Sequence, residues 1–260
     1  MPQRKSQQGQ TTMEQRIAVV TGGIGGLGTE ICKYLARSGR RVVAGDLAAR
    51  ADRIEAFRAE MAEFGDQVAF EPLNVADLDQ CADFAARVSS GYGTISVLVN
   101  AAGITRDTSL RKMSREQWDD VLKINLGGVF NMCRQVVDGM TAQGFGRIVN
   151  ISSVNGQTGQ FGQTNYSAAK AGMHGFTMAL AREVARKGVT VNSVSPGYCN
   201  TALVQAVPEE IRNQIVANIP VGRLGEPREI ARTVDFLAAD DAGFITGANI
   251  PVNGGYFMDF

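Results

Sequence analysis

The sequence is poor in the side chains that bind transition metals. Its 260 residues include one histidine, His174, and four cysteines that lie far apart without a CxxC spacing. This composition excludes a histidine-rich metal centre, offers no zinc-ligand pattern and disfavours a Ser-His-Asp triad. We therefore predict no metal site. The cysteines are expected to be small buried thiols of a reducing compartment, the cytoplasm: Cys32, Cys81, Cys133 and Cys199.

The sequence also lacks net charge and long apolar segments. Its 26 lysines and arginines balance 26 aspartates and glutamates, so no nucleic-acid or anionic membrane partner is expected. No apolar run approaches the roughly 18 residues of a membrane span. The polar first residues lack the apolar core of a signal peptide. We expect residues 1–13 to be a disordered leader, with Met13 as a second candidate start.

Short apolar runs alternate regularly with helical segments along the chain. The runs are rich in β-branched residues and apolar throughout, which is typical of strands buried on both faces of a parallel sheet. Predicted strands cover residues 16–21, 41–46, 67–73, 95–103, 146–152, 189–196 and 248–255. Predicted helices cover about residues 26–39, 50–65, 76–91, 114–140, 164–187 and 226–239. The pattern predicts an α/β, Rossmann-type doubly wound parallel sheet with helices on both faces, in a single domain over residues 14–260.

A glycine-rich turn follows the first predicted strand and opens the first helix. Its sequence, TGGIGGLG over residues 21–28, includes Gly22, Gly26 and Gly28. Glycine permits positive φ and lets backbone N–H groups at a helix start approach a pyrophosphate. Asp46 ends the second strand about 20 residues further on, where a carboxylate can bind the adenosine ribose of a dinucleotide. Together the turn and Asp46 predict dinucleotide binding. The alternative for the glycines is a purely structural turn, and the alternative for Asp46 is an acid that precedes the next helix.

Tyr166 and Lys170 stand four residues apart in the predicted helix over residues 164–187. Side chains at this spacing lie on one face of a helix. The pKa of a free tyrosine is about 10, and a neighbouring ammonium stabilises the phenolate. We therefore expect Lys170 to lower the pKa of Tyr166, so that the phenol can act as a general acid or base near neutral pH. The spacing alone also occurs in helices without such a function.

The glycine spacing and the Tyr-x-x-x-Lys pair together resemble the short-chain dehydrogenase/reductase family, and the resemblance covers nearly all of residues 14–260. It implies catalytic roles for Asn125, Ser153, Tyr166 and Lys170. Ser153 lies 13 residues before Tyr166 and would donate a hydrogen bond to the substrate carbonyl that Tyr166 protonates. Asn125 would hold a water that links Lys170 to solvent. The alternative for Ser153 is a turn serine at the end of a strand, and the alternative for Asn125 is a polar residue that the helix merely tolerates.

The same resemblance implies a nicotinamide dinucleotide cofactor and a homotetramer, with residues 114–140, residues 164–187 and the C-terminal NGGYFMDF at interfaces. Thr201 would contact the nicotinamide carboxamide, and residues up to about Ala217 would form a mobile substrate lid. Ala101 departs from the family's NNAG sequence, so we expect Asn100 to contribute and its neighbour to matter less. The predicted cofactor residues are Gly22, Ile24, Gly26, Leu27, Gly28, Asp46, Asn74, Val75, Asn100, Ala102, Gly103, Tyr166, Lys170, Pro196, Gly197 and Thr201.

Within this family, the segments NISSVNGQTGQFGQTNYSAAKAG and VTVNSVSPGY resemble the acetoacetyl-CoA reductases of polyhydroxyalkanoate synthesis. That resemblance implies a small-molecule acyl-CoA substrate, acetoacetyl-CoA, reduced at its 3-oxo group to the (3R)-hydroxy product. It places Gln160, Phe161, Gln163 and Tyr198 beside Ser153 around the substrate, with Phe161 packed against the short acyl chain or the pantetheine.

Two other functions are compatible with the sequence. A 3-oxoacyl carrier-protein reductase would perform the same chemistry on another carrier. The stretch before the predicted strand at residues 146–152, GMTAQGFG, lacks the basic docking residues expected of such an enzyme, although Arg186 and Lys187 could serve. A non-catalytic dinucleotide-sensing module would commonly have lost the tyrosine or the lysine, and this chain retains both.

Asp46 bears on the choice between NADH and NADPH. A carboxylate about 4 Å from the ribose phosphate of NADPH would repel each of its charges by roughly 1 kcal/mol in water and about 4 kcal/mol at a partly shielded surface. The sequence therefore predicts NADH as the preferred cofactor, against the NADPH expected of acetoacetyl-CoA reductases. NADPH stays possible because Arg50 and Arg53 lie just beyond the turn and could reach the phosphate.

Overall fold

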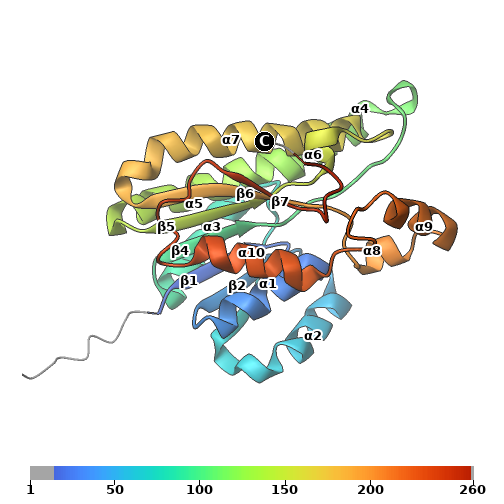
Figure 1. Cartoon of the computed structure of the whole chain (residues 1–260). Coiled ribbons are helices and arrows are strands. Elements are labelled where there is room, and N and C mark those ends of the chain that lie inside the picture. Colours follow the sequence, from blue (N-terminus) through green and yellow to red (C-terminus); the bar gives the residue numbers. More distant parts are fainter. Residues whose placement is uncertain (1–14, 259–260) are drawn as a thin grey trace, which may run out of the picture.

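The computed structural model describes residues 15–258, and Figure 1 shows one sheet between two layers of helices. The sheet has seven strands in the order β3-β2-β1-β4-β5-β6-β7, and all neighbouring strands pair in parallel. The predicted Rossmann-type fold is therefore confirmed. The predicted leader, residues 1–13, lies outside the described residues. The strands are β1 (Ile17–Thr21), β2 (Arg41–Asp46), β3 (Val68–Pro72), β4 (Ile95–Asn100), β5 (Gly146–Ile151), β6 (Val189–Pro196) and β7 (Asn249–Val252).

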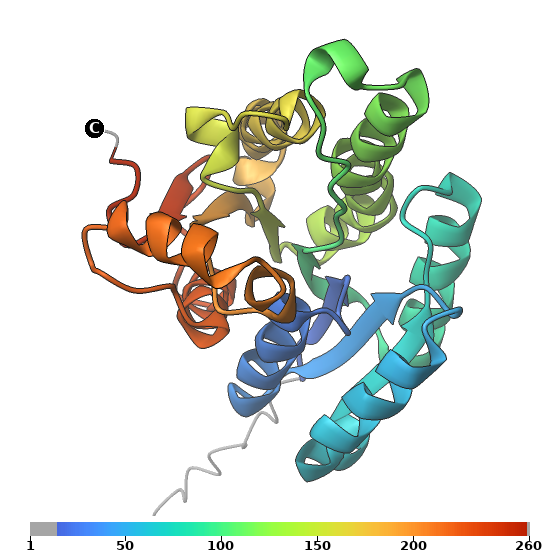
Figure 2. The same cartoon turned by 90° about the vertical axis from the view of Figure 1, so that its right-hand side faces the viewer.

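Helices bury an apolar core on each face of the sheet, and Figure 2 shows both layers from a second direction. One face is covered by α1 (Gly26–Arg37), α2 (Ala51–Glu60) and α10 (Pro227–Ala238). The other is covered by α3 (Leu78–Tyr92), α5 (Gly128–Gln143) and α7 (Thr164–Val184). Shorter helical elements are η1 (Ala62–Gln67), η2 (Leu110–Lys112), α4 (Arg115–Leu122), α6 (Asn155–Thr158), η4 (Ala185–Lys187), α8 (Ala202–Gln205) and α9 (Glu209–Ala217).

The order of strands reverses at β1, which pairs with β2 on one side and with β4 on the other. The connections that leave β1 and β4 therefore run to opposite faces of the sheet and leave a crevice at the carboxyl ends of these strands. Such a crevice is the usual ligand site of an open α/β sheet. The glycine turn follows β1, and the segments with Asn100, Ser153 and Pro196 lie at the carboxyl ends of β4, β5 and β6.

The predicted helix over residues 114–140 is interrupted. Its first part, α4, begins at a capping box formed by Ser114 and Gln117. A π-helical turn, η3 (Lys123–Gly127), then joins α4 to α5. The prediction of one continuous helix overlooked this turn, because the residues on both sides of it are compatible with helix. π turns frequently occur at functional sites, and this one contains the fully buried Asn125.

A row of polar residues crosses the sheet in register, from the carboxyl ends of β1 and β4 to the first residue of β7. Within it, the Nδ2 of Asn100 donates a hydrogen bond to Asn150 at 2.9 Å, and the Nδ2 of Asn150 donates to the hydroxyl of Thr177 on α7 at 2.9 Å. Leaving a buried polar group unpaired costs about 1–3 kcal/mol, so these bonds stabilise the packing of α7 on the sheet. The members, in register from β1 to β7, are Thr21, Asn100, Asn150, Ser193 and Asn249.

Candidate active site

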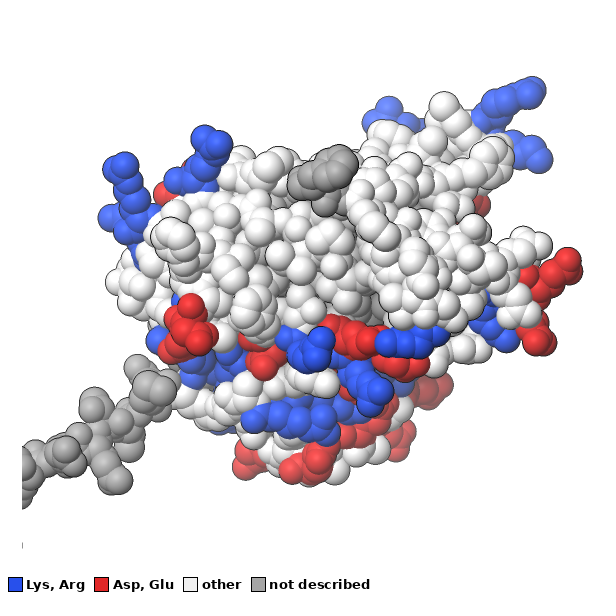
Figure 3. Space-filling view, viewed as in Figure 1, with Lys and Arg blue, Asp and Glu red and all other residues white. Residues whose placement is uncertain are grey.

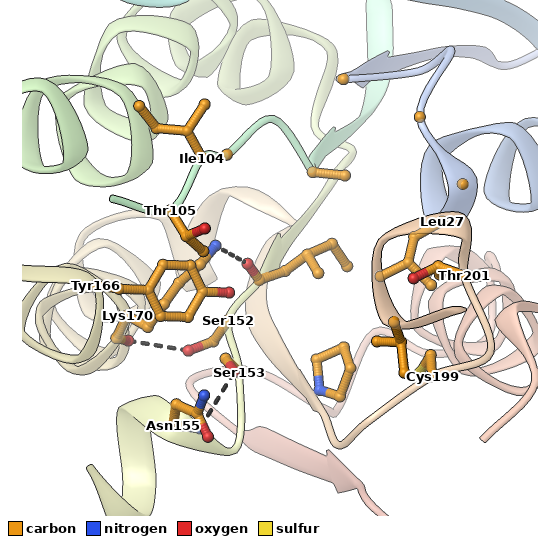
Figure 4. A pocket seen from close by; sticks show the side chains of 18 of the residues that line it. Leu27, Ile104, Thr105, Ser152, Ser153, Asn155, Tyr166, Lys170, Cys199 and Thr201 are labelled. Atoms are coloured by element: carbon orange, nitrogen blue, oxygen red, sulfur yellow. Dashed lines mark hydrogen bonds between the residues drawn. The ribbon is translucent and has the colours of Figure 1, made fainter. Parts of the chain in front are cut away.

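A cavity of about 610 Å³ lies at the carboxyl ends of β1, β4, β5 and β6. Its size is within the range of small-molecule sites, about 300–1,000 Å³. In Figure 4, Leu27 and Thr201 stand on one side of the cavity, and Ser153, Tyr166 and Lys170 stand on the other. The cavity therefore has two walls, one built on the glycine turn and the segment after β6, the other on α7 and the segment after β5.

The glycine turn after β1 has the geometry expected of a pyrophosphate site. Gly22 has a φ of +64°, and a Cβ there would lie 2.8 Å from the Cα of Ala102. A Cβ on Gly28 would lie 2.2 Å from the carbonyl oxygen of Gly22. Neither position accepts a side chain without a shift of the backbone. No side chain caps the first turn of α1, whose N-cap is Gly25. The N–H groups of that turn are therefore available to an anion.

Ten of the predicted dinucleotide residues line the cavity. A Cβ on Gly26 would lie 3.4 Å from the Cγ2 of Thr201, so α1 and the segment after β6 approach closely. Ala101, which we expected to matter less, also lines the cavity, whereas Ala102 does not. The predicted cofactor residues in the lining are Gly22, Gly26, Leu27, Gly28, Gly103, Tyr166, Lys170, Pro196, Gly197 and Thr201.

Six predicted cofactor residues lie outside the lining of this cavity. Asn100 is buried in the polar row, where it donates to Asn150. The side chain of Val75 packs against α5 at Gly128, where a Cβ would lie only 2.8 Å from the Cγ2 of Val75. Asn74 accepts a hydrogen bond from the backbone N–H of Ala76 at 3.1 Å. The six are Ile24, Asp46, Asn74, Val75, Asn100 and Ala102.

Asp46 is held beside the glycine turn at the carboxyl end of β2. Its Oδ1 accepts a hydrogen bond from the backbone N–H of Leu47 at 2.8 Å, and Arg50 forms an ion pair with it at 3.2 Å. Arg53 donates its Nε to the carbonyl oxygen of Ile24 at 3.0 Å. Both arginines that could have met a ribose phosphate are therefore already engaged, one by Asp46 and the other by the turn.

Ser153, Tyr166 and Lys170 meet on the second wall (Figure 4). The Nζ of Lys170 lies 5.6 Å from the ring centroid of Tyr166 and donates to the carbonyl oxygen of Ile151 at 2.7 Å. The backbone N–H of Asn155 donates to the Oγ of Ser153 at 3.1 Å. Because this hydroxyl already accepts a hydrogen bond, its own proton is available to an acceptor in the cavity.

Burial dominates the pKa values of this wall. Desolvation raises the pKa of Tyr166, and the nearby hydroxyl of Ser153 opposes the shift. Desolvation lowers the pKa of Lys170 to about 8. The net pKa shift of Tyr166 is therefore upward, opposite to the direction expected from Lys170, because burying a phenolate is costly; the effect of Lys170 on the phenol stays a prediction. At neutral pH Tyr166 keeps its proton, which is the form that a general acid needs.

Asn125 braces the segment that follows β4. Its Oδ1 accepts from the backbone N–H of Ile104 at 2.8 Å, and its Nδ2 donates to the carbonyl oxygen of the same residue at 2.9 Å. A Cβ on Gly103 would lie 3.3 Å from the Oδ1 of Asn125 and 3.7 Å from the Nζ of Lys170. The π turn therefore brings Asn125 close to Lys170, while its role in holding a water stays a prediction.

Two of the four residues predicted only for the substrate line the cavity, and two do not. Gln163 and Tyr198 are in the lining. Gln160 and Phe161 lie outside it, and Phe161 is 90% exposed. Gly159 and Gly162 flank this pair with φ values of +71° and +80°, and Gly162 is bonded through its carbonyl to the N–H of Thr108. These flanking turns direct Phe161 to solvent, which the sequence pattern did not reveal.

Sequence reasoning also missed cavity residues. Asn155 is buried, and its Nδ2 donates to the Oε1 of Gln163 at 2.9 Å; the Nε2 of Gln163 donates in turn to Asp107 at 2.8 Å. Asn155 could have been predicted from its position two residues after Ser153, just beyond the end of a strand. Thr105 and Arg106 follow β4 in the same way, since residues after parallel strands meet at one edge of the sheet.

The four cysteines are buried free thiols, as predicted. One of them, Cys199, lines the cavity, and burial raises its pKa to about 12, which keeps it protonated. Within residues 15–258, no three His, Cys, Asp or Glu side chains gather closely enough to hold a metal ion. No helix in that part of the chain has the length and apolar character needed to cross a membrane.

The fold and this site place the chain in the short-chain dehydrogenase/reductase family, and it belongs to that family of nicotinamide-dependent oxidoreductases. The family model that matches it is described as enoyl-(acyl carrier protein) reductase and covers residues 22–257. Among individual relatives, the acetoacetyl-CoA reductase of Allochromatium vinosum is 54% identical over 94% of this chain and 99% of its own. That of Cupriavidus necator is 54% identical over 95% of this chain and 100% of its own. A 3-oxoacyl-[acyl-carrier-protein] reductase of Haemophilus influenzae is 42% identical over 95% of this chain and 100% of its own.

Lys170→Met should change how stability depends on pH. The folded-state pKa of Lys170 is about 8, against 10.5 for an unburied lysine. The unfolded chain therefore binds more protons between these values, and the free energy of unfolding rises with pH there. Relative to Lys170→Met, the wild type should gain up to about 3 kcal/mol between pH 8 and 10.5. Urea unfolding across this range measures the free energy of unfolding of the wild type and of each variant. Lys112→Met, at an exposed lysine, is the control, and its difference from the wild type should not change with pH. The expectation is contradicted if the difference for Lys170→Met does not change with pH either.

Proposed function

We propose that the protein reduces the 3-oxo group of acetoacetyl-CoA to give (3R)-3-hydroxybutanoyl-CoA. The observation that carries this proposal is the placement of Ser153, Tyr166 and Lys170 on one wall of a cavity whose other wall is the glycine turn. The wall with Ser153, Tyr166 and Lys170 suits a carbonyl that gains a proton, and the wall with the glycine turn suits a dinucleotide. Four relatives named acetoacetyl-CoA reductase, 51–54% identical over nearly the whole chain, support this substrate.

Each residue of the second wall has a distinct part in the proposed reaction. The hydroxyl of Ser153 donates a hydrogen bond to the 3-oxo oxygen, and Tyr166 gives its phenolic proton to the same oxygen as negative charge develops there. The ammonium of Lys170, 5.6 Å from the ring, stabilises the phenolate that is left. A nicotinamide dinucleotide, when bound along the glycine turn, supplies the hydride.

Tyr166→Phe should abolish turnover and leave dinucleotide affinity nearly intact, because it removes only the transferable proton. General acid–base steps contribute about 10²–10⁴-fold, so the loss of kcat should fall in that range. Lys170→Ala should lower both kcat and dinucleotide affinity. Initial rates and fluorescence titration of the dinucleotide measure the two quantities. If Tyr166→Phe kept more than about a tenth of the wild-type rate, the assignment of the acid would be wrong.

Coenzyme A is the proposed carrier of the acyl group. Arg186 and Lys187, the basic residues that could receive an acidic carrier protein, form η4 beyond the carboxyl end of α7. At a rise of about 1.5 Å per residue, they lie roughly 30 Å along the helix from Tyr166. Within one chain they are thus remote from the cavity. Tyr198, which packs edge-on against Tyr256 at 5.5 Å between ring centroids, limits the acyl pocket on its own side.

Acetoacetyl-CoA should have the highest kcat/KM among related thioesters, with longer 3-oxoacyl chains poorer because Tyr198 restricts the pocket. Initial rates with acetoacetyl-CoA, a medium-chain 3-oxoacyl carrier-protein thioester and crotonyl-CoA test this, and chiral chromatography should find the (3R) product. A higher kcat/KM for the carrier-protein substrate would favour the carrier-protein reductase. Preference for crotonyl-CoA would favour the enoyl reduction that the family description names.

NADH is the proposed cofactor, with NADPH usable. A ribose phosphate beside Asp46 would meet its carboxylate and would have to draw Arg50 away from its ion pair. Arg53 is held by the carbonyl of Ile24 and would have to leave the turn. The ribose hydroxyls of NADH, in contrast, are hydrogen-bond donors that a carboxylate can accept.

Asp46→Ala should lower kcat/KM with NADH and raise it with NADPH, because the acceptor of the ribose hydroxyls and the repelling charge are both removed. The ratio of the two efficiencies should change by about tenfold or more, given a repulsion of roughly 1–4 kcal/mol per charge. Asp52→Ala, which removes an exposed carboxylate from the first turn of α2, should leave the ratio unchanged. A wild type that prefers NADPH, or an Asp46→Ala variant with an unaltered ratio, would show that Asp46 does not read the ribose.

We also infer a cytoplasmic homotetramer. Figure 3 shows few charges over α7 and β7, whereas charged side chains gather over the layer with α1, α2 and α10. Large exposed apolar side chains, which often mark interfaces, include Phe130 on α5 and Met178 on α7. Four buried free thiols suit a reducing compartment. Sedimentation equilibrium of the full chain tests the assembly.

A further inference from the structure

His174, the only histidine of the chain, does not line the cavity but lies close to the residues that do. Tyr166, Lys170 and His174 follow one another at intervals of four residues on α7, so they share one face of the helix. The side chain of His174 is half-buried, and its Nε2 lies 3.3 Å from the Oγ of Ser195 near the carboxyl end of β6.

The hydrogen bonds around Ser195 decide which atom of this pair is the donor. Ser195 donates to the Oδ1 of Asn249 at 2.7 Å, and Ser193 donates to the same oxygen at 3.0 Å. A hydroxyl has one proton, and that of Ser195 is used by Asn249. With the amide of Asn249 oriented so that its Oδ1 accepts from Ser195, His174 carries a hydrogen on Nε2 and donates it to Ser195. The resulting chain of hydrogen bonds runs from α7 through β6 to β7.

This chain ties α7 to the strand that carries the opposite wall of the cavity. Ser195 directly precedes Pro196 and Gly197, which line the cavity. Lys170 and Thr177 instead tie α7 to β5, through the carbonyl of Ile151 and the side chain of Asn150. Between residues 15 and 258, the hydrogen bond of His174 is the only one that a side chain of α7 makes with β6.

We propose that His174 is a positioning residue that, by donating to Ser195, sets the end of β6 relative to Tyr166 and Lys170. Together with the backbone bond from the N–H of Val154 to the carbonyl of Pro196 at 2.8 Å, the hydrogen bond thereby helps to set the spacing of the two walls between which the substrate carbonyl and the dinucleotide meet. A misplacement of about 1 Å at a reacting centre can cost roughly 100-fold in rate. The role of His174 rests on the proposed ketone reduction, and the residue acts without touching the substrate.

Substitutions at positions 174 and 177 of the full chain test this role. His174→Leu removes the donor, whereas His174→Gln offers an amide N–H in a comparable place. Thr177→Val is the matched control, because it removes a buried hydrogen bond of the same helix that leads to β5. With acetoacetyl-CoA, His174→Leu should lower kcat about tenfold, and His174→Gln should recover to within about threefold of the wild type. Thr177→Val should stay within about twofold while losing comparable thermal stability.

Ser195→Ala removes the acceptor and tests the pair from its other side, which covers the case of a His174→Leu variant that does not fold. Its kcat should fall about as far as that of His174→Leu, and the double variant should fall no further. Independent, additive losses would overturn the proposal, as would a His174→Gln variant no better than His174→Leu. If the wild type reduces no 3-oxoacyl thioester, the proposed function fails as well; if the wild type and His174→Leu turn over equally, only the role of His174 fails.

Discussion

The buried ammonium of Lys170 needs a hydrogen-bond acceptor, and it finds one at the carbonyl of Ile151, the last residue of β5. Charged groups are costly to bury unless they are bonded. The hydroxyl of Ser152 completes the attachment by donating to the carbonyl oxygen of Lys170 at 2.9 Å. Since Tyr166 precedes Lys170 by one turn and Ser153 follows Ser152 directly, this one attachment brings the proposed proton donor and carbonyl ligand together.

The parallel sheet supplies the second requirement, a place where segments distant in sequence end side by side. Because every strand runs in the same direction, the residues after β1, β4, β5 and β6 all reach the same edge. Asn100 and Asn150, in the polar row across the sheet, bond to each other through the Nδ2 of Asn100 and the Oδ1 of Asn150, while the buried Oδ1 of Asn100 has no partner among the described residues. The site therefore stands on rigid strands, with its glycine turn where a Cβ on Gly22 or Gly28 would collide with backbone.

Local sequence patterns were sufficient for the elements and for much of the site. The predicted strand over residues 189–196 has the bounds of β6, since a strand buried on both faces reads as one apolar run. Tyr166 and Lys170 were singled out by their spacing and Ser153 by the family resemblance, and all three line one cavity. The π turn at Asn125 and the outward position of Phe161 were not found, because the residues on either side of the turn are all compatible with helix and the position of Phe161 depends on the φ angles of neighbouring glycines.

By itself the sequence determined which residue types stand at each strand end and how Tyr166 and Lys170 share a helix face, because both follow from local periodicity. Only the tertiary structure decided their environment. Lys170 is buried by residues far away in the chain, and the resulting desolvation sets the direction of the pKa shifts of both groups. Asn155 enters the cavity and Phe161 stays outside it for a similar reason: a side chain's exposure depends on what the rest of the chain packs around it, which spacing along the sequence does not encode.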